Sequence, residues 1–373
     1  MAELYPFLFY GFVGITLLNC GYYLYFSRFS FTKLPENSSK TIEFPGVSVI
    51  VCAKNEAENL KKNIPLLIGQ DYPSFEIILI NDNSSDDTLE IIKSFAESHT
   101  NIQFVDVIGN ENFWGSKKYA LSLGIKRAKY QHLLFTDADC IPTSTNWIQD
   151  MAAHFNEEKT IVLGYGAYAK VKKSWLNKII RFETLLTAIQ YFSYAKNNNP
   201  YMGVGRNLAY TAETFYNNSG FMQHIKIPSG DDDLFINSAA NSKNTAICFS
   251  TSSFTLSEPK LSWKSWFTQK RRHTSVAKHY KTQHKIQLGA FYMSQILFLL
   301  LGAILLAFGF QWPFILSIIL LRYLIVWTVI SGAGIKLQEK DLLLWFPLIE
   351  IFLISFQLSI FITNTLAKPR RWK

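Results

Sequence analysis

Two carboxylates separated by one residue directly follow a short apolar segment. Asp137 and Asp139 flank Ala138 immediately after the segment 132–136. Carboxylates at this spacing can bind one hard divalent cation, Mg2+ or Mn2+, through oxygen. Such a cation would neutralise a diphosphate leaving group and act as a Lewis acid. The alternative is a turn in which the two Asp residues cap the next helix, and the neighbouring polar loops favour the metal site.

A second acidic group lies further along the chain. Asp231, Asp232 and Asp233 stand between Gly230 and Leu234, at the start of a predicted amphipathic helix. Adjacent like charges raise the pKa of at least one carboxyl, as a general base requires. That base would take the proton of an acceptor hydroxyl. The alternative is helix capping, which the helix dipole favours.

Further polar residues follow other predicted strands. Asp82 could accept a hydrogen bond from a base or a ribose, although Asx-turn chemistry would explain it equally simply. Lys117 or Lys118 could contact a donor phosphate, and a solvated helix face is nearly as good an explanation for either one. The loop Gly203-Val-Gly-Arg-Asn207 would let backbone approach a ligand closely.

These residues need a scaffold that brings them together, and the alternation of strand and helix signals over residues 45–255 predicts one. Strands are expected at 47–53, 75–80, 102–107 and 132–136, with helices from Glu58, over 84–98 and over 117–128. This order predicts an α/β fold with a parallel sheet and helices on both faces. In such sheets the ligand binds at the carboxyl ends of the strands, where the polar loops fall.

The ends of the chain are apolar. Tyr5–Phe26 and Leu288–Phe310 carry no charge, Trp312–Ile330 contains only Arg322, and Leu342–Thr363 contains only Glu350. Segments of this length can span a bilayer. The first segment lacks the basic start of a signal peptide. Arg322 and Glu350 each need a polar partner in the membrane, and they could pair with each other.

The distribution of basic residues predicts the orientation. Arg28 and Lys33 follow the first segment, which places the central domain on the cytoplasmic face. Four spans would leave the C-terminus outside, yet the tail 368–373 is basic. One late segment is therefore expected to be re-entrant or interfacial, and the segment that contains Pro347 is the preferred candidate. We predict a membrane helix over 1–27, a cytoplasmic domain over 28–287, and a membrane region over 288–373 with two to three helices.

Two aromatic-rich amphipathic stretches, Trp175–Tyr194 and Trp263–Tyr280, either lie in the membrane interface or pack against the sheet.

The net charge of +9 is attributed to basic residues that face anionic lipid, because no nucleic-acid motif is present. The four cysteines are scattered, suit a reduced compartment and receive no function.

Taken together, the motifs resemble those of glycosyltransferase family 2, which has the GT-A fold, a Rossmann-like nucleotide-diphospho-sugar transferase domain. The resemblance covers roughly residues 45–275. It is carried by VSVIVCAKNEAENL, NDNSSDDT, Asp137-Ala138-Asp139, Gly203-Val-Gly-Arg-Asn-Leu, SGDDDLF and Gln269-Lys-Arg-Arg272.

The resemblance implies a role for each matching position. Asp139 and Asp137 would hold the metal, and Asp231 or Asp232 would be the base, with a slight preference for Asp231. The donor site would comprise Ala53, Asn55, Glu56, Asp82, Lys117, Asp137, Ala138, Asp139 and Arg272. Gly205, Arg206, Asn207 and Gln269 would bind the acceptor or serve the site in another way.

Gln269-x-x-Arg272 is similar to the Gln-x-x-Arg-Trp motif of membrane-bound members, such as ceramide glucosyltransferases and cellulose or hyaluronan synthases. His273 stands where that motif has Trp, which removes the basis for acceptor stacking at this position. Arg272 would still neutralise diphosphate.

The implied activity is inverting transfer from a nucleotide-sugar, most commonly a uridine diphosphate sugar, to a lipid or lipid-linked acceptor at a bacterial inner or cell membrane. A processive polysaccharide synthase is the first alternative, disfavoured by the few membrane segments. A non-catalytic, membrane-tethered binding protein is the second.

Overall fold

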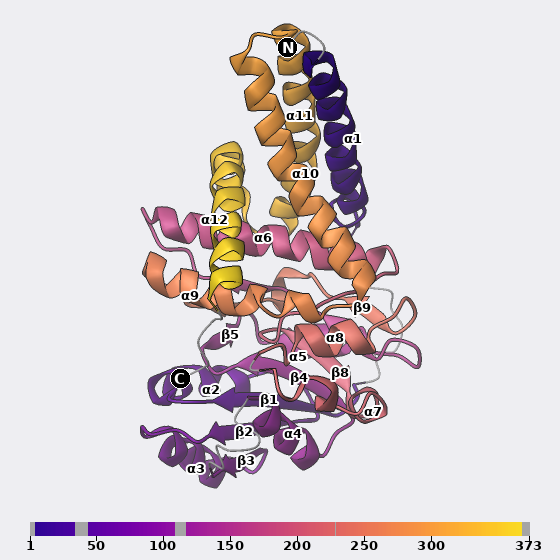
Figure 1. Cartoon of the computed structure of the whole chain (residues 1–373). Helices are drawn as coiled ribbons and strands as arrows, with labels where there is room; N and C mark the ends of the chain where they lie inside the picture. The colour runs from indigo at the N-terminus through magenta and orange to yellow at the C-terminus, as the bar shows by residue number, and fades with distance from the viewer. Residues whose placement is uncertain (1–3, 34–43, 109–116, 228, 368–373) are drawn as a thin grey trace.

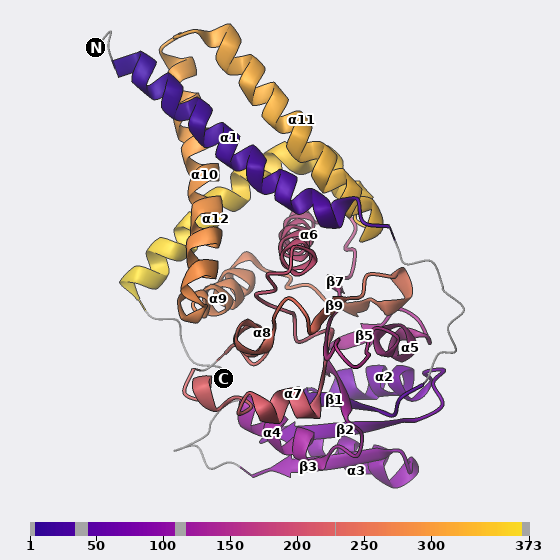
Figure 2. The same ribbon diagram turned by 90° about the vertical axis from the view of Figure 1, so that its right-hand side faces the viewer.

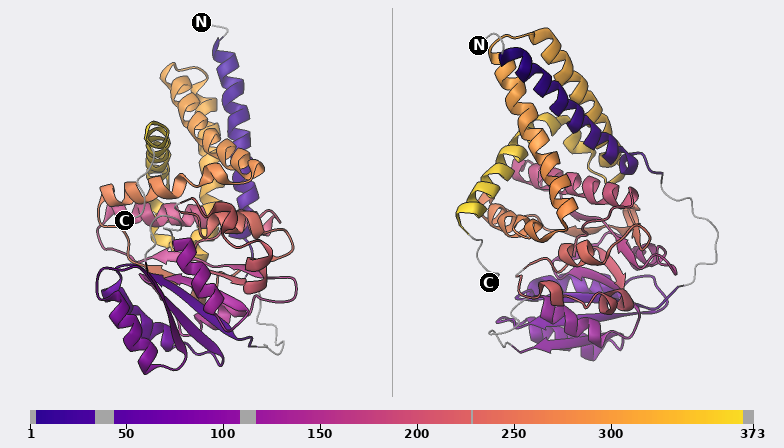
Figure 3. Two further views of the ribbon diagram at one scale, coloured as in Figure 1. Left: turned by 60° about the horizontal axis from the view of Figure 1, so that its bottom comes forward. Right: turned by 45° about the vertical axis from the view of Figure 1, so that its right-hand side comes forward.

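The computed structural model describes residues 4–33, 44–108, 117–227 and 229–367. An α/β domain carries a group of long apolar helices, and one long helix, α6 (Trp175–Lys196), lies between the two (Figure 1). The domain presents one edge of its sheet toward that helical layer (Figure 3).

Within the described part of the chain, the main sheet has seven strands in the order β3-β2-β1-β4-β8-β6-β9. Their bounds are β1 (Val47–Ala53), β2 (Phe75–Asp82), β3 (Ile102–Val107), β4 (His132–Asp137), β6 (Ile161–Leu163), β8 (Leu208–Thr211) and β9 (Thr245–Ile247). The four predicted strands are confirmed as the parallel set β1–β4. β2 and β4 run slightly further than expected, so Asp82 and Asp137 are the last residues of their strands.

The predicted parallel pairing holds for β1–β4, but the sheet as a whole is mixed, because β8 runs antiparallel to both β4 and β6. The chain reaches β8 through the loop 203–207, and Leu208 pairs with Phe135 near the carboxyl end of β4. A strand that enters from that edge must run back along β4. The reversal therefore brings the glycine-marked loop to the edge that carries Asp137.

Helices on both faces of the sheet are confirmed. Successive strand residues point to opposite faces, so Ile50 packs in one core with Leu121 of α4 (Lys117–Arg127), while Val49 packs in another with Leu60 of α2 (Ala57–Ile68). The remaining helices of the domain are α3 (Thr88–Ser98), α5 (Trp147–Ala152), α7 (Ala212–Asn217) and α8 (Asp233–Ala239). A small second sheet joins β5 (Cys140–Pro142), β10 (Thr255–Ser257) and β7 (Gly166–Tyr168).

The two aromatic-rich stretches are packed helices that join the layers. Tyr191 of α6 donates a hydrogen bond to the Gly164 carbonyl in the domain, at 2.7 Å, and Ser193 donates to the Phe26 carbonyl of the first helix, at 3.0 Å. The second stretch begins with α9 (Trp263–Thr274), and the ring of Trp266 stacks on Phe356, with centroids 4.1 Å apart.

Four helices in the described residues are long and apolar enough to cross a membrane. They are α1 (Leu4–Ser30), α10 (Thr282–Ala307), α11 (Trp312–Lys336) and the segment Lys340–Leu366, which comprises the 3-10 turn η4 (Lys340–Trp345) and α12 (Phe346–Leu366). α1, α10 and α11 rise together, whereas α12 runs across the lower part of that bundle toward α9 (Figure 2).

A buried ion pair joins these helices, as the sequence suggested. The Arg322 guanidinium of α11 donates to both carboxylate oxygens of Glu350 on α12, at 2.6 and 2.7 Å. Its Nε also donates to Asn19 of α1, at 3.0 Å. The expected pairing of Arg322 with Glu350 is confirmed.

Removal of one partner of this pair should destabilise the protein strongly. Glu350→Ala leaves the Arg322 guanidinium buried and unpaired, which typically costs about 3–5 kcal/mol. We expect a large fall in the unfolding midpoint of the purified protein in detergent. The double variant Arg322→Leu/Glu350→Leu removes both charges and should recover much of the loss. A single variant that unfolds at the wild-type temperature would show that the pair contributes little.

Candidate functional site

The strand register aligns the polar ends of three strands in one row. Asp137 at the end of β4 pairs with Cys52 of β1, and Ala53 at the end of β1 pairs with Asn81 of β2. Asp82 follows Asn81 as the last residue of β2. The residues predicted to share one edge of the sheet therefore do so.

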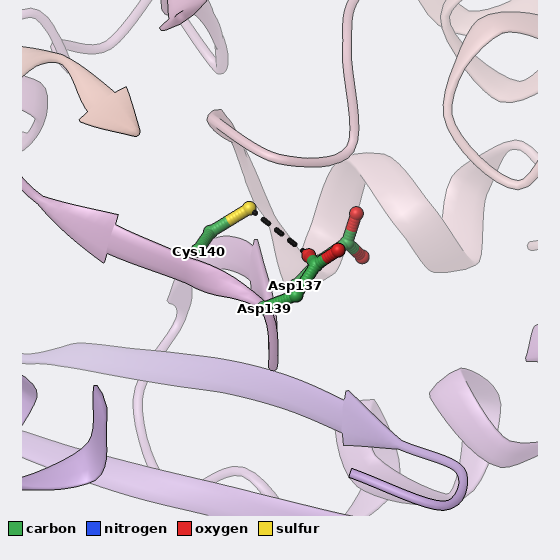
Figure 4. A group of neighbouring side chains, drawn as sticks. All are labelled: Asp137, Asp139 and Cys140. Carbon is green, nitrogen blue, oxygen red and sulfur yellow. Dashed lines mark hydrogen bonds between the residues drawn. The ribbon is translucent and has the colours of Figure 1, made fainter. Parts of the chain in front are cut away.

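Asp137, Asp139 and Cys140 form a compact group in which one donor atom from each residue lies within 4.8 Å of the others (Figure 4). Burial raises the pKa of the Cys140 thiol well above its usual value, and Ser257 lies 2.9 Å away, so the sulfur stays a neutral thiol. Hard cations prefer oxygen ligands. The two carboxylates are accordingly the ligands that fit Mg2+ or Mn2+.

The electrostatics of the two carboxylates differ. Burial raises the pKa of Asp139, and the negative charge of Asp137 raises it further. Burial also acts on Asp137, but the Lys117 ammonium outweighs it and lowers the pKa of that carboxyl. A pair of close, half-buried carboxylates with one lysine leaves negative charge that a divalent cation would balance.

Lys117 connects the metal carboxylates with the second acidic group. Its Nζ lies 2.6 Å from Asp137 and 3.4 Å from Asp231. These three side chains line one cavity, together with Gly205 and Asp232. Residues from β4, α4 and the start of α8 thus meet in a single polar cavity.

The three consecutive aspartates have different environments. Asp232 accepts hydrogen bonds from the backbone N–H groups of Gly205, at 2.7 Å, and Asp233, at 2.8 Å. Asp233 accepts from the Tyr280 hydroxyl, at 2.7 Å, and from the Leu234 N–H, at 2.8 Å. Burial raises the pKa of Asp232 to about 6 and that of Asp233 to about 8, with the neighbouring aspartate charges adding to both.

Of the two lysines considered for donor phosphate, only Lys117 lines the cavity. The Lys118 ammonium is buried and donates to three carbonyls in the segment before the aspartates: His224 at 2.8 Å, Ile227 at 2.9 Å and Ser229 at 2.8 Å. Lys118 therefore holds the chain that leads into Asp231.

The loop after β1 is fastened to the loop after β2. The side chain of Asn55 accepts a hydrogen bond from the Ser85 N–H, at 2.8 Å, and its own N–H donates to Ser84, at 3.0 Å. Next to it, burial raises the pKa of Glu56, and the charges of Asp139 and Asp137 add to the shift, so Glu56 lies within electrostatic reach of these two carboxylates. Burial likewise raises the pKa of Asp82.

Two of the residues predicted for the donor site, Ala53 and Ala138, could contribute only through their backbone. Ala53 and Ala138 are buried, and the Ala138 carbonyl accepts a hydrogen bond from Asn63, at 2.8 Å. Their side chains have no polar atom to offer, so they fix the course of the loops beside the site.

The residues of the glycine-marked loop 203–207 have different roles. Gly205 lies against Asp232, and a Cβ there would stand 3.3 Å from a carboxylate oxygen of that residue. Arg206 donates to the Gly166 carbonyl, at 2.8 Å, and stacks on Tyr168. Asn207 is completely buried and accepts from the Trp147 indole, at 3.0 Å. Arg206 and Asn207 therefore support the loop, while Gly205 lines the cavity.

The predicted motif on α9 reaches the same region. Burial lowers the pKa of the Arg272 guanidinium, and the charges of Asp231, Asp137 and Asp232 oppose that shift. Arg272 thus lies within electrostatic reach of the cavity carboxylates. Gln269 is half-buried on the same helix, and His273 is exposed.

Three residues at the site escaped the sequence analysis in these roles: Tyr280, Lys118 and Cys140. Tyr280 contacts Asp233 across 47 positions of the chain. No local pattern indicates a partner so distant. The only feature of the sequence that pointed to Tyr280 was the aromatic composition of the stretch that begins at Trp263.

Residues 48–222 match the family model described as glycosyl transferase family 2. These residues form a glycosyl transferase family 2 domain. The structure is similar to that of the mannosyltransferase PcManGT of Pyrobaculum calidifontis, solved with GDP-Man and Mn2+. The TM-score is 0.59 at 18% identity, over 90% of this chain and 98% of that one. This likeness establishes the GT-A fold of the family 2 domain.

Curated relatives match a shorter stretch. The poly-beta-1,6-N-acetyl-D-glucosamine synthase of Staphylococcus epidermidis is 35% identical over 120 residues, which are 32% of this chain and 28% of the relative. The synthase of that name from Staphylococcus aureus strain COL is 35% identical over 122 residues, with the same shares. The chain thus spans under a third of the length of the curated relatives it matches.

The raised pKa of Asp233 predicts a pH-dependent stability. A carboxyl whose pKa is about 8 in the folded protein and about 3.9 in the unfolded chain favours folding while it is protonated. That contribution is fully present below pH of about 4 and is lost as pH rises through about 8. Asp233→Asn keeps an acceptor for Tyr280 without the charge.

We therefore expect the unfolding midpoint of the wild type, measured without metal or donor, to fall from pH 5 to pH 8 more steeply than that of Asp233→Asn. The variant should be the more stable protein at pH 8. Parallel pH profiles for the two proteins would contradict the assigned environment of Asp233.

Proposed function

We propose that this protein is an inverting, metal-dependent glycosyltransferase that moves a sugar from a nucleotide-sugar donor to a lipid or lipid-linked acceptor at the membrane. The observation that carries the proposal is the single cavity lined by Asp137, Lys117 and Asp231. It joins a cation-binding carboxylate, a phosphate-binding ammonium and a candidate base. The family 2 domain and its GT-A fold support this function.

The donor would bind across the ends of β1, β2 and β4. Asp82 at the end of β2 would accept hydrogen bonds from the nucleoside, and the loop of Asn55 and Glu56 would form one wall. Asp137 and Asp139 would hold the divalent cation, which supplies Lewis-acid stabilisation of the diphosphate. Lys117 would exchange its contact with Asp137 for a phosphate oxygen.

Asp231 is the best candidate for the base. Asp232 and Asp233 each accept two hydrogen bonds from the protein, which commits them to holding the start of α8. Asp231 is directed at Lys117 in the cavity, at 3.4 Å. A base must reach the proton that it removes. Among the three aspartates, Asp231 is the one that pairs with Lys117, the lysine that also pairs with Asp137 in the cavity.

The chemistry would be a direct displacement. Asp231 would take the proton from the acceptor hydroxyl while the oxygen of that hydroxyl forms a bond to the anomeric carbon. The bond from that carbon to the nucleoside diphosphate breaks on the opposite face, which inverts the configuration. Lys117 and Arg272 stabilise the negative charge of the departing diphosphate, and this electrostatic contribution should be large in a half-buried site.

A processive polysaccharide synthase is the second candidate, and the names of the staphylococcal relatives favour it. Their similarity is confined to 32% of this chain. The four candidate membrane helices of the described residues offer little room for a polymer channel. Transfer to a lipid or lipid-linked acceptor therefore stands first. A bilayer-tethered binding protein without catalysis is the third candidate.

The assignment of the base makes a discriminating prediction. Asp231→Asn should bind a nucleotide-sugar with wild-type affinity and reduce transfer at least about 100-fold, the scale of general-base contributions. Asp232→Asn retains a hydrogen-bond acceptor for Gly205 and should keep substantial transfer. Donor binding by calorimetry and product formation from radiolabelled nucleotide-sugars would check both. Loss of transfer in Asp232→Asn with retention in Asp231→Asn would move the base by one residue.

The acceptor class can be tested in cells. Expression of the wild type should create a glycosylated lipid that mass spectrometry of membrane extracts detects, and Asp231→Asn should not create it. A high-molecular-weight polysaccharide in place of the lipid would favour the processive synthase. Absence of both products, together with absence of donor binding by the purified protein, would favour the binding protein.

A further inference from the structure

We propose that α12 lies within the membrane leaflet next to the α/β domain and does not cross the bilayer. The described chain would then cross the membrane three times, through α1, α10 and α11. The exposed apolar face of α12 would be covered by acyl chains of that one leaflet. This placement does not depend on the reaction proposed above.

The three crossing helices each have one end at the domain. Near the end of α1, the Phe26 carbonyl accepts from Ser193 of α6, at 3.0 Å. At the end of α11, Lys336 donates to the Phe29 carbonyl, at 3.1 Å. At the start of α10, His284 contacts Asn199, at 2.9 Å, just beyond α6.

Their other ends meet far from the domain. Tyr5 near the start of α1 packs against Phe308 and Phe310 in the turn between α10 and α11, with ring centroids 5.4 and 5.6 Å apart. The N-terminal end of α1 and this turn lie together at the tip of the bundle in Figures 1 and 2. α1, α10 and α11 thus run between a domain side and an opposite side.

The segment that leads into α12 is fastened to the domain side. Arg181 of α6 forms ion pairs with Glu339 and Asp341, and Arg181 and Glu339 are 3% and 2% exposed. Lys170 adds an ion pair to Asp341, at 2.9 Å, and donates to the Gln338 carbonyl, at 2.9 Å. A buried arginine with two acidic partners is costly to separate. The chain therefore enters α12 on the domain side.

The end of α12 is fastened to the same side. Arg271 of α9 donates to the Asn364 side chain, at 2.9 Å, and to the Ala367 carbonyl, while Asn364 donates back to the Arg271 carbonyl, at 3.0 Å. α9 is itself bound to α6 through the ion pair of Lys270 with Glu183. Both ends of α12 therefore contact elements that pack on the α/β domain.

Length alone would let α12 span. Its 21 residues extend roughly 32 Å as a helix, close to the thickness of the hydrocarbon layer. Its contacts argue against a span, because both of its ends are bound to elements on the domain side, and it runs obliquely across the lower part of the bundle (Figure 2). Leu348, Phe361 and Leu366 are 60%, 66% and 81% exposed. Such an apolar surface along a helix that begins and ends on the domain side fits acyl chains of one leaflet.

The basic composition of residues 368–373 gives independent support, since Lys and Arg favour the cytoplasmic side. The placement also has a consequence for the site. α12 supports α9 through the stack of Phe356 on Trp266, and α9 carries Gln269 and Arg272. The helix that reaches the cavity carboxylates would then lie directly under the leaflet from which a lipid would arrive.

Sided accessibility of epitope tags tests the proposal in the full chain. One tag is inserted after Gly309, where an added Cβ would have no neighbouring atom within 4 Å. A second follows the exposed Glu157 of the α/β domain, and a third follows Lys373. Antibody and protease access is compared in intact spheroplasts and in inverted vesicles. Each tagged protein must elute as a monodisperse peak in detergent.

We expect the tags at 157 and 373 to be accessible from the same side and the tag at 309 from the opposite side. A tag at 373 that shares the side of the tag at 309 would mean that α12 spans, and would overturn the proposal. A tag at 309 on the side of the domain would overturn it as well, because α10 and α11 would then not cross.

Discussion

Several carboxylates lie half-buried at one edge of the sheet, and their mutual repulsion is the constraint on which the rest of the site depends. Asp137 and Asp139 are close enough to share one cation, and Asp231 lines the same cavity as Asp137. Charges removed from water are tolerated when they are paired. Lys117 pairs with both Asp137 and Asp231, and a divalent cation with a bound diphosphate would complete the balance.

The scaffold is organised to keep that cluster in place. The reversed strand β8 delivers the loop of Gly205 to the end of β4, where its N–H holds Asp232. Tyr280 holds Asp233, and Lys118 fastens the preceding segment through three carbonyls. These contacts come from three separate parts of the chain. Together they leave Asp231 as the aspartate that pairs with Lys117, which is why a run of three similar residues can contain a single candidate base.

Sequence reasoning recovered what local patterns encode. The apolar run Val47–Ala53 is β1 with the expected bounds, and the acidic pair after the fourth strand lies where the parallel register requires. The pairing of Arg322 with Glu350 followed from the cost of a charge in lipid. The direction of β8 did not follow, because a four-residue strand has no pattern that distinguishes parallel from antiparallel pairing. The contact of Tyr280 with Asp233 and the carbonyl contacts of Lys118 depend on tertiary packing, which no spacing in the chain reveals.

The central claim is that Asp139 and Asp137 bind a cation that carries the donor's diphosphate. Calorimetric titration of the purified protein with uridine diphosphate, in Mn2+ and in a chelator, tests it most directly. Asp71→Ala is the matched control, because Asp71 is exposed and precedes the amino end of β2, whereas the site lies at the carboxyl ends of the strands. The account predicts Mn2+-dependent binding by the wild type and by Asp71→Ala, and none by Asp139→Ala. Binding that is equally strong in the chelator, or unchanged in Asp139→Ala, would contradict it.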